Sequence, residues 1–262
     1  MGKKHNIKQL NTTRLSCIYD KQTFASNLIK KLLADDAQRL FANAEQIYET
    51  SNATSYKVQI KNQTYFMKKL KIKKGRKALM NMLMPSCKSC FHAAYRLLDS
   101  GIHTPKALLA AIYGTEHHQV LITEYIEGAS NLDEYIINAS PAKRAIILPE
   151  LAKELARFYS KGFYSRHLRS ANIMVFKDDS KRVYTFIDLE KMGSNKLSGT
   201  GTYISTISRA CFEFYFHLSK EEQHHLLRLC FDAGIKYNIF HKPSQIDSFI
   251  KKTAKQIKKR RQ

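Results

Sequence analysis

The sequence of 262 residues contains no run of about 18 apolar residues, which excludes an ordinary membrane-spanning helix. Its basic start, MGKKHNIKQLNTTRL, lacks the apolar core of a secretory signal peptide. Asn6 stands where a myristoylation signal carries Ser or Thr, so the initial Met-Gly does not indicate that modification. These absences favour a cytoplasmic protein.

Cysteines are few and are scattered along the chain as Cys17, Cys87, Cys90, Cys211 and Cys230. An odd number in a chain of this size does not indicate a disulfide scaffold. Cys87 and Cys90 have the spacing of a zinc-binding pair, but no second pair completes such a site. We therefore expect ordinary reduced thiols.

Acidic residues are scarce, because 22 Asp and Glu stand against 44 Lys and Arg and leave a net charge of +22. Such a charge attracts nucleic acid, an anionic membrane surface, or an acidic lipid or sugar. The sequence has no RNA-recognition signature and no zinc-finger spacing, and its basic residues are spread rather than interleaved with aromatics. A basic nucleic-acid-binding protein thus remains an alternative that rests on charge alone.

Residues 162–190, GFYSRHLRSANIMVFKDDSKRVYTFIDLE, contain two apolar runs on either side of a polar turn. This pattern predicts a β-hairpin centred on Ser180 with a five-residue connection. In that register Asn172 lies opposite Asp188, at one end of the hairpin. Amide and carboxylate oxygens are ligands that Mg²⁺ takes together with substrate phosphates. The alternative is a surface hairpin that ends in two polar residues.

The same stretch resembles the H-R-D-L-x-x-x-N and D-F-G motifs of protein-kinase-like folds, through RHLRSAN at 166–172 and DLE at 188–190. The resemblance implies that Asn172 and Asp188 bind the metal. Glu190 replaces the glycine of D-F-G and adds a carboxylate near that metal.

One position departs from the kinase pattern, since His167 stands where the catalytic Asp is expected. An unperturbed imidazole has a pKa near 6.5 and is mostly neutral at pH 7. His167 is therefore expected to accept or orient the acceptor hydroxyl as a general base. The alternative is that the role is lost and the chain is a scaffold of kinase shape.

Further segments extend the resemblance in order along the chain, namely KKLKIKKGRKAL, KSCFHAAYRLLDSGIHTPKALLA and VLITEYIEGASNL. From about Asn43 to about Ala233 the sequence resembles the bacterial lipopolysaccharide core kinases, the Kdo- and heptose-kinase group. The resemblance implies an α+β, two-lobed fold with a small β-rich N-lobe and a larger, mostly helical C-lobe. It also implies ATP with Mg²⁺ as cofactors.

The acceptor implied by the resemblance is a Kdo or heptose hydroxyl of the lipopolysaccharide core or of a lipid A-core intermediate. Members of this family work as peripheral proteins at the cytoplasmic face of the inner membrane. No nucleic-acid partner is expected.

Nucleotide-binding residues of the N-lobe also follow from the resemblance. Of two adjacent strand lysines, Lys68 and Lys69, the kinase pattern selects Lys68 for the phosphates. A polar loop without glycine replaces the usual phosphate-covering loop and offers Ser51, Asn52, Thr54 and Ser55. The backbone of Glu124, Tyr125 and Ile126 is expected to bind adenine. The helix that should carry an acidic partner for Lys68 has Lys88, Ser89 and Cys90 instead.

Four parts are expected along the chain: a helical extension (1–45), the N-lobe (46–127), the C-lobe (128–245) and a basic tail (246–262). Apolar residues at helical spacing, Phe24, Leu28, Leu32 and Leu33, predict the extension. The tail carries Ile246, Phe249, Ile250 and Ile257 on one face and many cations elsewhere. This pattern is typical of a helix that lies on an anionic membrane surface, and a solvated tail is the alternative.

Three function classes follow. The first is an ATP-dependent kinase of the lipopolysaccharide core, favoured because the metal pair and the strand lysine are all present. The second is a catalytically impaired pseudokinase with a regulatory or scaffolding role in envelope biogenesis. The third is the nucleic-acid-binding protein.

Overall fold

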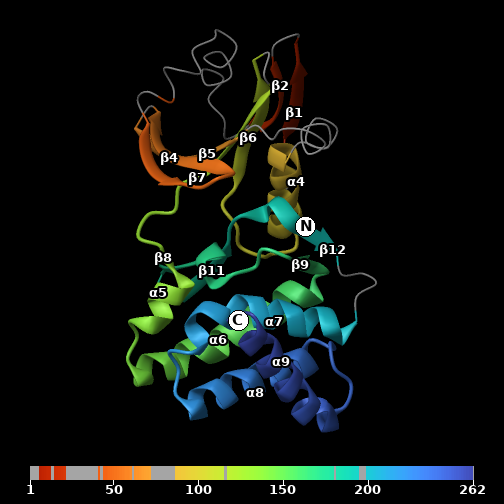
Figure 1. Cartoon of the computed structure of the whole chain (residues 1–262). Helices are drawn as coiled ribbons and strands as arrows, with labels where there is room; N and C mark the ends of the chain where they lie inside the picture. Colours follow the sequence, from red (N-terminus) through yellow and green to blue (C-terminus); the bar gives the residue numbers. More distant parts are fainter. Residues whose placement is uncertain are drawn as a thin grey trace. The chain divides into compact units, whose positions relative to one another are not determined.

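The computed structural model of the chain describes residues 6–12, 15–21, 41, 44–60, 62–71, 86–114, 117–179, 181–194 and 199–261. The chain divides into two compact units, Met1–Glu127 and Gly128–Gln262, which are coloured red to green and green to blue in Figure 1. Glu127 is also the residue at which the sequence analysis ended its N-lobe. Among the described residues, no helix is long and apolar enough to cross a membrane.

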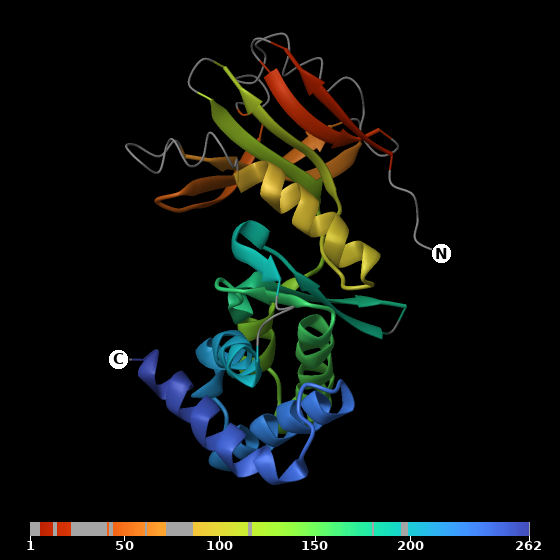
Figure 2. The same ribbon diagram turned by 90° about the vertical axis from the view of Figure 1, so that its right-hand side faces the viewer.

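The described part of the first unit forms an antiparallel sheet in the order β1-β2-β6-β7-β5-β4-β3. Its strands are β1 (Ile7–Asn11), β2 (Leu15–Asp20), β3 (Glu45–Glu49), β4 (Ala53–Ile60), β5 (Gln63–Leu70), β6 (Ala107–Tyr113) and β7 (His118–Glu124). The helix α4 (Ser86–Asp99) packs on β6 and β7, and Figure 2 shows it lying along one face of the sheet.

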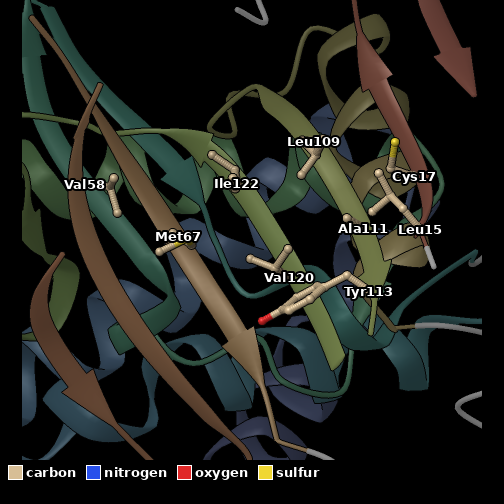
Figure 3. Packing of buried hydrophobic residues seen from close by; sticks show 9 residues of the cluster. All are labelled: Leu15, Cys17, Val58, Met67, Leu109, Ala111, Tyr113, Val120 and Ile122. Carbon is tan, nitrogen blue, oxygen red and sulfur yellow. The ribbon is translucent and has the colours of Figure 1, made fainter. Parts of the chain in front are cut away.

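The two faces of this sheet are covered differently, because successive side chains of a strand point to opposite sides. One face carries a buried apolar cluster, drawn in Figure 3: Leu15, Cys17, Val58, Met67, Leu109, Ala111, Tyr113, Val120 and Ile122. The other face contacts α4, where Lys88 Nζ donates to Ser16 Oγ at 2.8 Å and Cys87 N donates to Gln119 Oε1 at 3.3 Å. The residues that alternate with the cluster residues along each strand therefore point to the sheet face on which α4 packs.

The start of the chain differs from the expected helical extension. Ile7–Asn11 and Leu15–Asp20 form β1 and β2, which join the edge of the sheet through pairing of β2 with β6. The physical reason is the period of two in Leu15-Ser16-Cys17, which buries Leu15 and Cys17 in the apolar cluster. The helical pattern of Phe24, Leu28, Leu32 and Leu33 lies outside the described residues.

The second unit is mostly helical (Figures 1 and 2). Its helices are α5 (Leu132–Ile137), α6 (Pro141–Ser160), α7 (Thr200–Tyr215), α8 (Lys220–Lys236) and α9 (Ile246–Lys259). Its strands are β8 (Ser130–Asn131), β9 (Phe163–Ser165), β10 (Ile173–Asp178), β11 (Lys181–Phe186) and β12 (Met192–Ser194). Short 3-10 helices lie at η1 (Ser170–Asn172), η2 (Leu189–Lys191) and η3 (Pro243–Gln245).

Two helices show how local sequence sets their ends. The helix α8 begins with a capping box, in which Ser219 accepts from the Glu222 backbone and Glu222 accepts from that of Ser219. The helix α6 begins at Pro141, after the cap Ser140. Pro at the first position of a helix costs no hydrogen bond, because an N–H at that position has no partner within the helix.

The apolar face of α9 is buried in the second unit and is not free for a membrane, contrary to the expectation for the tail. Phe249 and Ile257 are buried, and Phe249 contacts the rings of Tyr203, Phe231 and Phe240. The cations remain on the outer side, where Lys251, Lys252, Lys255, Lys258 and Lys259 are exposed. The amphipathic pattern of α9 thus arises from packing against the protein's own core.

All five cysteines are free and buried, in agreement with the expectation of ordinary thiols. Burial raises the pKa of Cys87 to about 12. A thiol with such a pKa is protonated at neutral pH and is a poor nucleophile or metal ligand.

Candidate functional site

The predicted hairpin exists as β10 and β11, but its register differs by one residue from the predicted one. The ladder runs from Ile173 paired with Phe186 to Asp178 paired with Lys181, which leaves a two-residue connection and not five. Asp179 has φ of 42°, the left-handed conformation that two-residue hairpin turns favour. The tighter turn moves the opposite strand by one position.

The site residues still converge at the end of the hairpin. The backbone of Asn172 pairs with Ile187, whose N–H donates to the Asn172 carbonyl at 2.9 Å. The side-chain Nδ2 of Asn172 donates to the His167 carbonyl at 2.8 Å and to Asp188 Oδ2 at 3.4 Å. His167 Nδ1 lies 3.8 Å from the same Asp188 oxygen. Three polar side chains from two segments therefore meet at one place.

Asp188 has a backbone conformation that few residues other than glycine adopt. Its φ of 55° and ψ of 61° put it in the left-handed region at the start of η2. Such a conformation costs on the order of 1–3 kcal/mol and is concentrated at functional sites, although Asp tolerates it better than most residues. The strain falls on the residue that the sequence pattern assigns to the metal.

The oxygen atoms at this place fit a magnesium ion that takes its remaining ligands from a nucleotide. Both interactions of the Asn172 amide use Nδ2, so its Oδ1 remains for a cation beside the Asp188 carboxylate. Within the described ranges, no group of three or more His, Cys, Asp or Glu side chains could hold a metal by itself. Mg²⁺ usually binds through one or two carboxylates and takes its other ligands from phosphates and water. Glu190 is half-buried in η2, two residues beyond Asp188.

Glu213, which no motif of the sequence indicated, holds the loop before the hairpin. Its carboxylate accepts from the Ser170 N–H at 3.2 Å and from Ser170 Oγ at 2.6 Å, and it forms an ion pair with Arg169. Burial alone would raise the pKa of Glu213, but the hydrogen bonds from Ser170 and Arg169 outweigh it and lower the pKa below its ordinary value. Loop residues 165–172 are thus tied to α7. The available signal was one acid inside the apolar run FEFYF.

In the first unit, the structure distinguishes the two strand lysines. Lys68 pairs with Leu121 and so lies on the sheet face that α4 covers. Lys69 points to the other face, where its Nζ lies 4.8 Å from the centre of the Phe41 ring. The first turn of α4 contains no acid, and the acid of this helix is Asp99 at its end.

The predicted phosphate-covering loop is shorter than expected. Ser51 and Asn52 lie in the turn between β3 and β4, and Thr50 Oγ1 accepts from the Asn52 N–H at 3.2 Å. Thr54 and Ser55, however, are buried residues of β4. They extend the sheet because their backbones pair with Lys69 and Lys68. Ser51 and Asn52 thus lie in the loop, whereas Thr54 and Ser55 lie in the strand that follows it.

The predicted adenine-binding segment begins at the end of β7. The Glu124 N–H donates to the Lys106 carbonyl at 3.0 Å, and the Glu124 carbonyl accepts from Thr123 Oγ1 at 3.0 Å. Both backbone groups of Glu124 thus have partners within the first unit. Tyr125 and Ile126 follow the strand and are half-buried.

Comparison with known proteins gives a family and a fold. Residues 34–200 match the model of the lipopolysaccharide kinase (Kdo/WaaP) family. No curated protein matches the chain. Among solved structures, WaaP in complex with acyl carrier protein matches with a TM-score of 0.59 and 13% identity, over 87% of this chain and 96% of that one.

A second solved structure, the PknI kinase domain from Mycobacterium tuberculosis, matches with a TM-score of 0.46 and 11% identity. That match covers 82% of this chain and 96% of the PknI chain. The predicted kinase-like fold, with a β-rich first unit and a mostly helical second unit, is confirmed by the match to WaaP.

Proposed function

The chain belongs to the lipopolysaccharide kinase (Kdo/WaaP) family, and from this premise we propose that it transfers phosphate from ATP to a sugar hydroxyl of the lipopolysaccharide inner core. The acceptor sugar is Kdo or a heptose. The observation that supports catalysis most directly is the convergence of Asn172, Asp188 and His167 at the end of the hairpin.

Asp188 and Asn172 are the proposed magnesium ligands, through a carboxylate and the amide Oδ1, and Glu190 adds a second carboxylate nearby. When bound, Mg²⁺ neutralises charge on the phosphates during transfer. Lys68 is the proposed phosphate-binding cation of the first unit, since it shares the α4-covered sheet face. Ser51, Asn52 and the backbone at Tyr125 and Ile126 are proposed to contact the rest of the nucleotide.

His167 is the proposed acceptor-side base. Its Nδ1 lies 3.8 Å from Asp188 Oδ2, and its imidazole is proposed to accept the proton of the sugar hydroxyl through Nε2. As that proton leaves, the hydroxyl oxygen forms its bond to the γ-phosphorus and the bond from phosphorus to ADP breaks. The hydrogen bond from the His167 N–H to Ser165 Oγ at 3.0 Å fixes the backbone on which the ring is carried.

Phosphate transfer from ATP to Kdo-containing acceptors tests these roles. We expect Asp188→Ala to lower kcat by about 10²–10³-fold or more, as for loss of a strong electrostatic contact. His167→Ala should lower kcat by about 10²–10⁴-fold, as for loss of a general base. Asp178→Ala removes an exposed carboxylate from the same hairpin and should leave kcat unchanged.

The outcomes separate the remaining alternatives. Full activity without Asp188 would contradict the metal assignment, whereas full activity without His167 would remove only His167 from the chemistry. A pseudokinase would bind ATP with Mg²⁺, seen as a rise in Tm, without turnover; the missing acid in the first turn of α4 favours this second candidate. If the protein neither binds ATP nor turns it over, the nucleic-acid-binding alternative remains, which rests on net charge alone.

We also place the protein at the cytoplasmic face of the inner membrane, through its charge and not through an inserted apolar helix. The exposed lysines of α9 would each contribute on the order of 1 kcal/mol near an anionic leaflet. The same assay with the acceptor in anionic vesicles should therefore lose activity as salt is raised, more steeply than with a detergent-free, water-soluble acceptor. Equal salt dependence of both would contradict this location.

A further inference from the structure

Arginines lie within and beside the loop that carries His167. Arg166 precedes His167 and is exposed, and its carbonyl accepts a hydrogen bond at 2.8 Å from Nη1 of Arg209 in α7. Arg209 lies one helical turn before Glu213, which holds the other end of the same loop through Ser170. The guanidinium of Arg209 is thus fixed next to the proposed base.

A third arginine approaches from the end of α9. Ser208 Oγ lies 3.3 Å from Gln256 Oε1, which joins α7 and α9 beside Arg209. Arg260 follows Gln256 by about one turn and caps the helix. Burial and the neighbouring charge of Arg209 lower the pKa of Arg260, which is consistent with two guanidinium groups held close together.

The protein offsets the positive charge of this group only in part, since the charge of Glu213 raises the pKa of Arg260 but does not outweigh burial and Arg209. The nearby acid Glu213 already accepts from Ser170 and pairs with Arg169. Within the described part of the chain, Arg166, Arg209 and Arg260 form no ion pair with a carboxylate. Like charges placed together are unfavourable, and a bound anion would offset that repulsion. Guanidinium groups bind carboxylates and phosphates through paired hydrogen bonds, so these are the anions expected.

We propose that Arg166, Arg209 and Arg260 form a binding site for an acidic group of the sugar acceptor, a carboxylate or a phosphate, next to His167. This proposal rests on the proposed kinase function and narrows its substrate to an anionic sugar. Kdo itself carries a carboxylate, whereas an unmodified heptose is neutral. The site would orient the acceptor so that its hydroxyl meets His167, which is a positioning role for the three arginines.

The test is direct binding of small probes to the full-length protein without nucleotide. Kdo, inorganic phosphate and neutral mannose are titrated, and binding is followed by calorimetry or by NMR. We expect the first two probes to bind and mannose not to bind. Arg166→Gln and Arg260→Gln should each weaken binding by about 10-fold or more, as for loss of a hydrogen bond to a charged group.

Two further variants keep the result interpretable. Arg228→Gln removes one exposed charge from α8, a helix that carries none of the three arginines, and should leave binding unchanged. Arg209→Lys keeps the charge but not the paired geometry, and should weaken binding less than Arg260→Gln does. Thermal unfolding of every variant verifies that the second unit remains folded. Binding of phosphate alone points to a phosphorylated acceptor, and binding of Kdo alone to the sugar carboxylate; both support the site.

The proposed anion site and the proposed kinase function can be rejected separately. Unchanged probe binding in Arg166→Gln and Arg260→Gln, or equal weakening in Arg228→Gln, would overturn the site. If the kinase is active, the same variants should raise KM for the acceptor about 10-fold and leave KM for ATP unchanged. Specific anion binding in a protein that phosphorylates no core acceptor would keep the site and reject the proposed function.

Discussion

Each unit contains a carboxylate held in a hydrogen-bonded network, and the two networks are built for different tasks. Asp20 of the first unit is fully buried, with Lys106 Nζ at 3.0 Å and Tyr95 OH at 2.9 Å. Glu213 of the second unit is 16% exposed and binds Ser170 and Arg169. The first network joins strand β2, helix α4 and the start of β6, whereas the second joins helix α7 to a loop.

The difference lies in what each network holds. Tyr95 OH also lies 2.9 Å from the Ala107 carbonyl, so these partners of Asp20 belong to the sheet, to the residue before β6 or to the covering helix. Burial and the hydrogen bond to Asp20 raise the pKa of Tyr95 above its ordinary value, which keeps it a donor. The Glu213 network instead holds the residues between His167 and Asn172. We infer that Asp20 stabilises the fold and that Glu213 positions the site.

The largest expected effect is on stability, from Asp20→Ala. Removal of one partner from a buried ion pair leaves Lys106 uncompensated and should lower the free energy of unfolding by about 3–5 kcal/mol. Urea unfolding checks this. Glu127→Gln, at an exposed carboxylate of the same unit, should change it by about 0.5 kcal/mol or less. A loss below about 1 kcal/mol in Asp20→Ala would show that the first network does not carry the stability assigned to it.

Glu213→Gln should have a smaller effect on stability and a distinct effect on catalysis. Loss of charged hydrogen bonds should cost about 1–3 kcal/mol at pH 7. The folded pKa of Glu213 is lowered, so its contribution is present above the ordinary value of 4.5 and is lost as the pH falls through the folded pKa. The stability difference between wild type and variant should therefore shrink below about pH 4.5.

Activity measurements complete this comparison. Because Glu213 holds the loop of His167, kcat of the folded variant should fall, whereas Asp232→Asn, at an exposed carboxylate of α8, should change neither property. A constant stability difference between pH 7 and pH 4 would contradict the assigned charge state. An unchanged kcat would make Glu213 a purely structural residue, like Asp20.

The kinase-like fold was implied by the resemblance to a known family, whereas the meeting of Asn172 with Asp188 followed from local information. A hairpin follows from two apolar runs and a turn, and side chains at its end stay close even when the register shifts by one. The exact pairing depended on Asp179, whose left-handed backbone shortened the connection. Turn length was the part that apolar periodicity does not specify.

Long-range partners could not be predicted in the same way. Asp20 and Tyr95 are 75 positions apart in sequence, and Ser170 and Glu213 are 43 apart. Periodicity describes which face of an element is apolar but not what covers that face. The same limit explains α9, whose apolar stripe was assigned to a membrane although Phe249 and Ile257 are buried in the protein's own core.

The smallest expected effects come from removing one hydroxyl from each network, and they separate the two tasks most cleanly. Tyr95→Phe deletes a donor to Asp20, and Ser170→Ala deletes the donor that reaches Glu213 at 2.6 Å. Each should cost about 1 kcal/mol of stability, the net contribution of a single hydrogen bond. The expected kinetics differ: Tyr95→Phe should leave kcat unchanged, while Ser170→Ala should lower it by loosening the loop of His167. Equal kcat in the two variants would mean that the loop keeps its geometry without the hydrogen bond from Ser170 Oγ to Glu213. In that case the backbone bond from Asn172 N to the Arg169 carbonyl, at 2.9 Å, would be sufficient to hold the site.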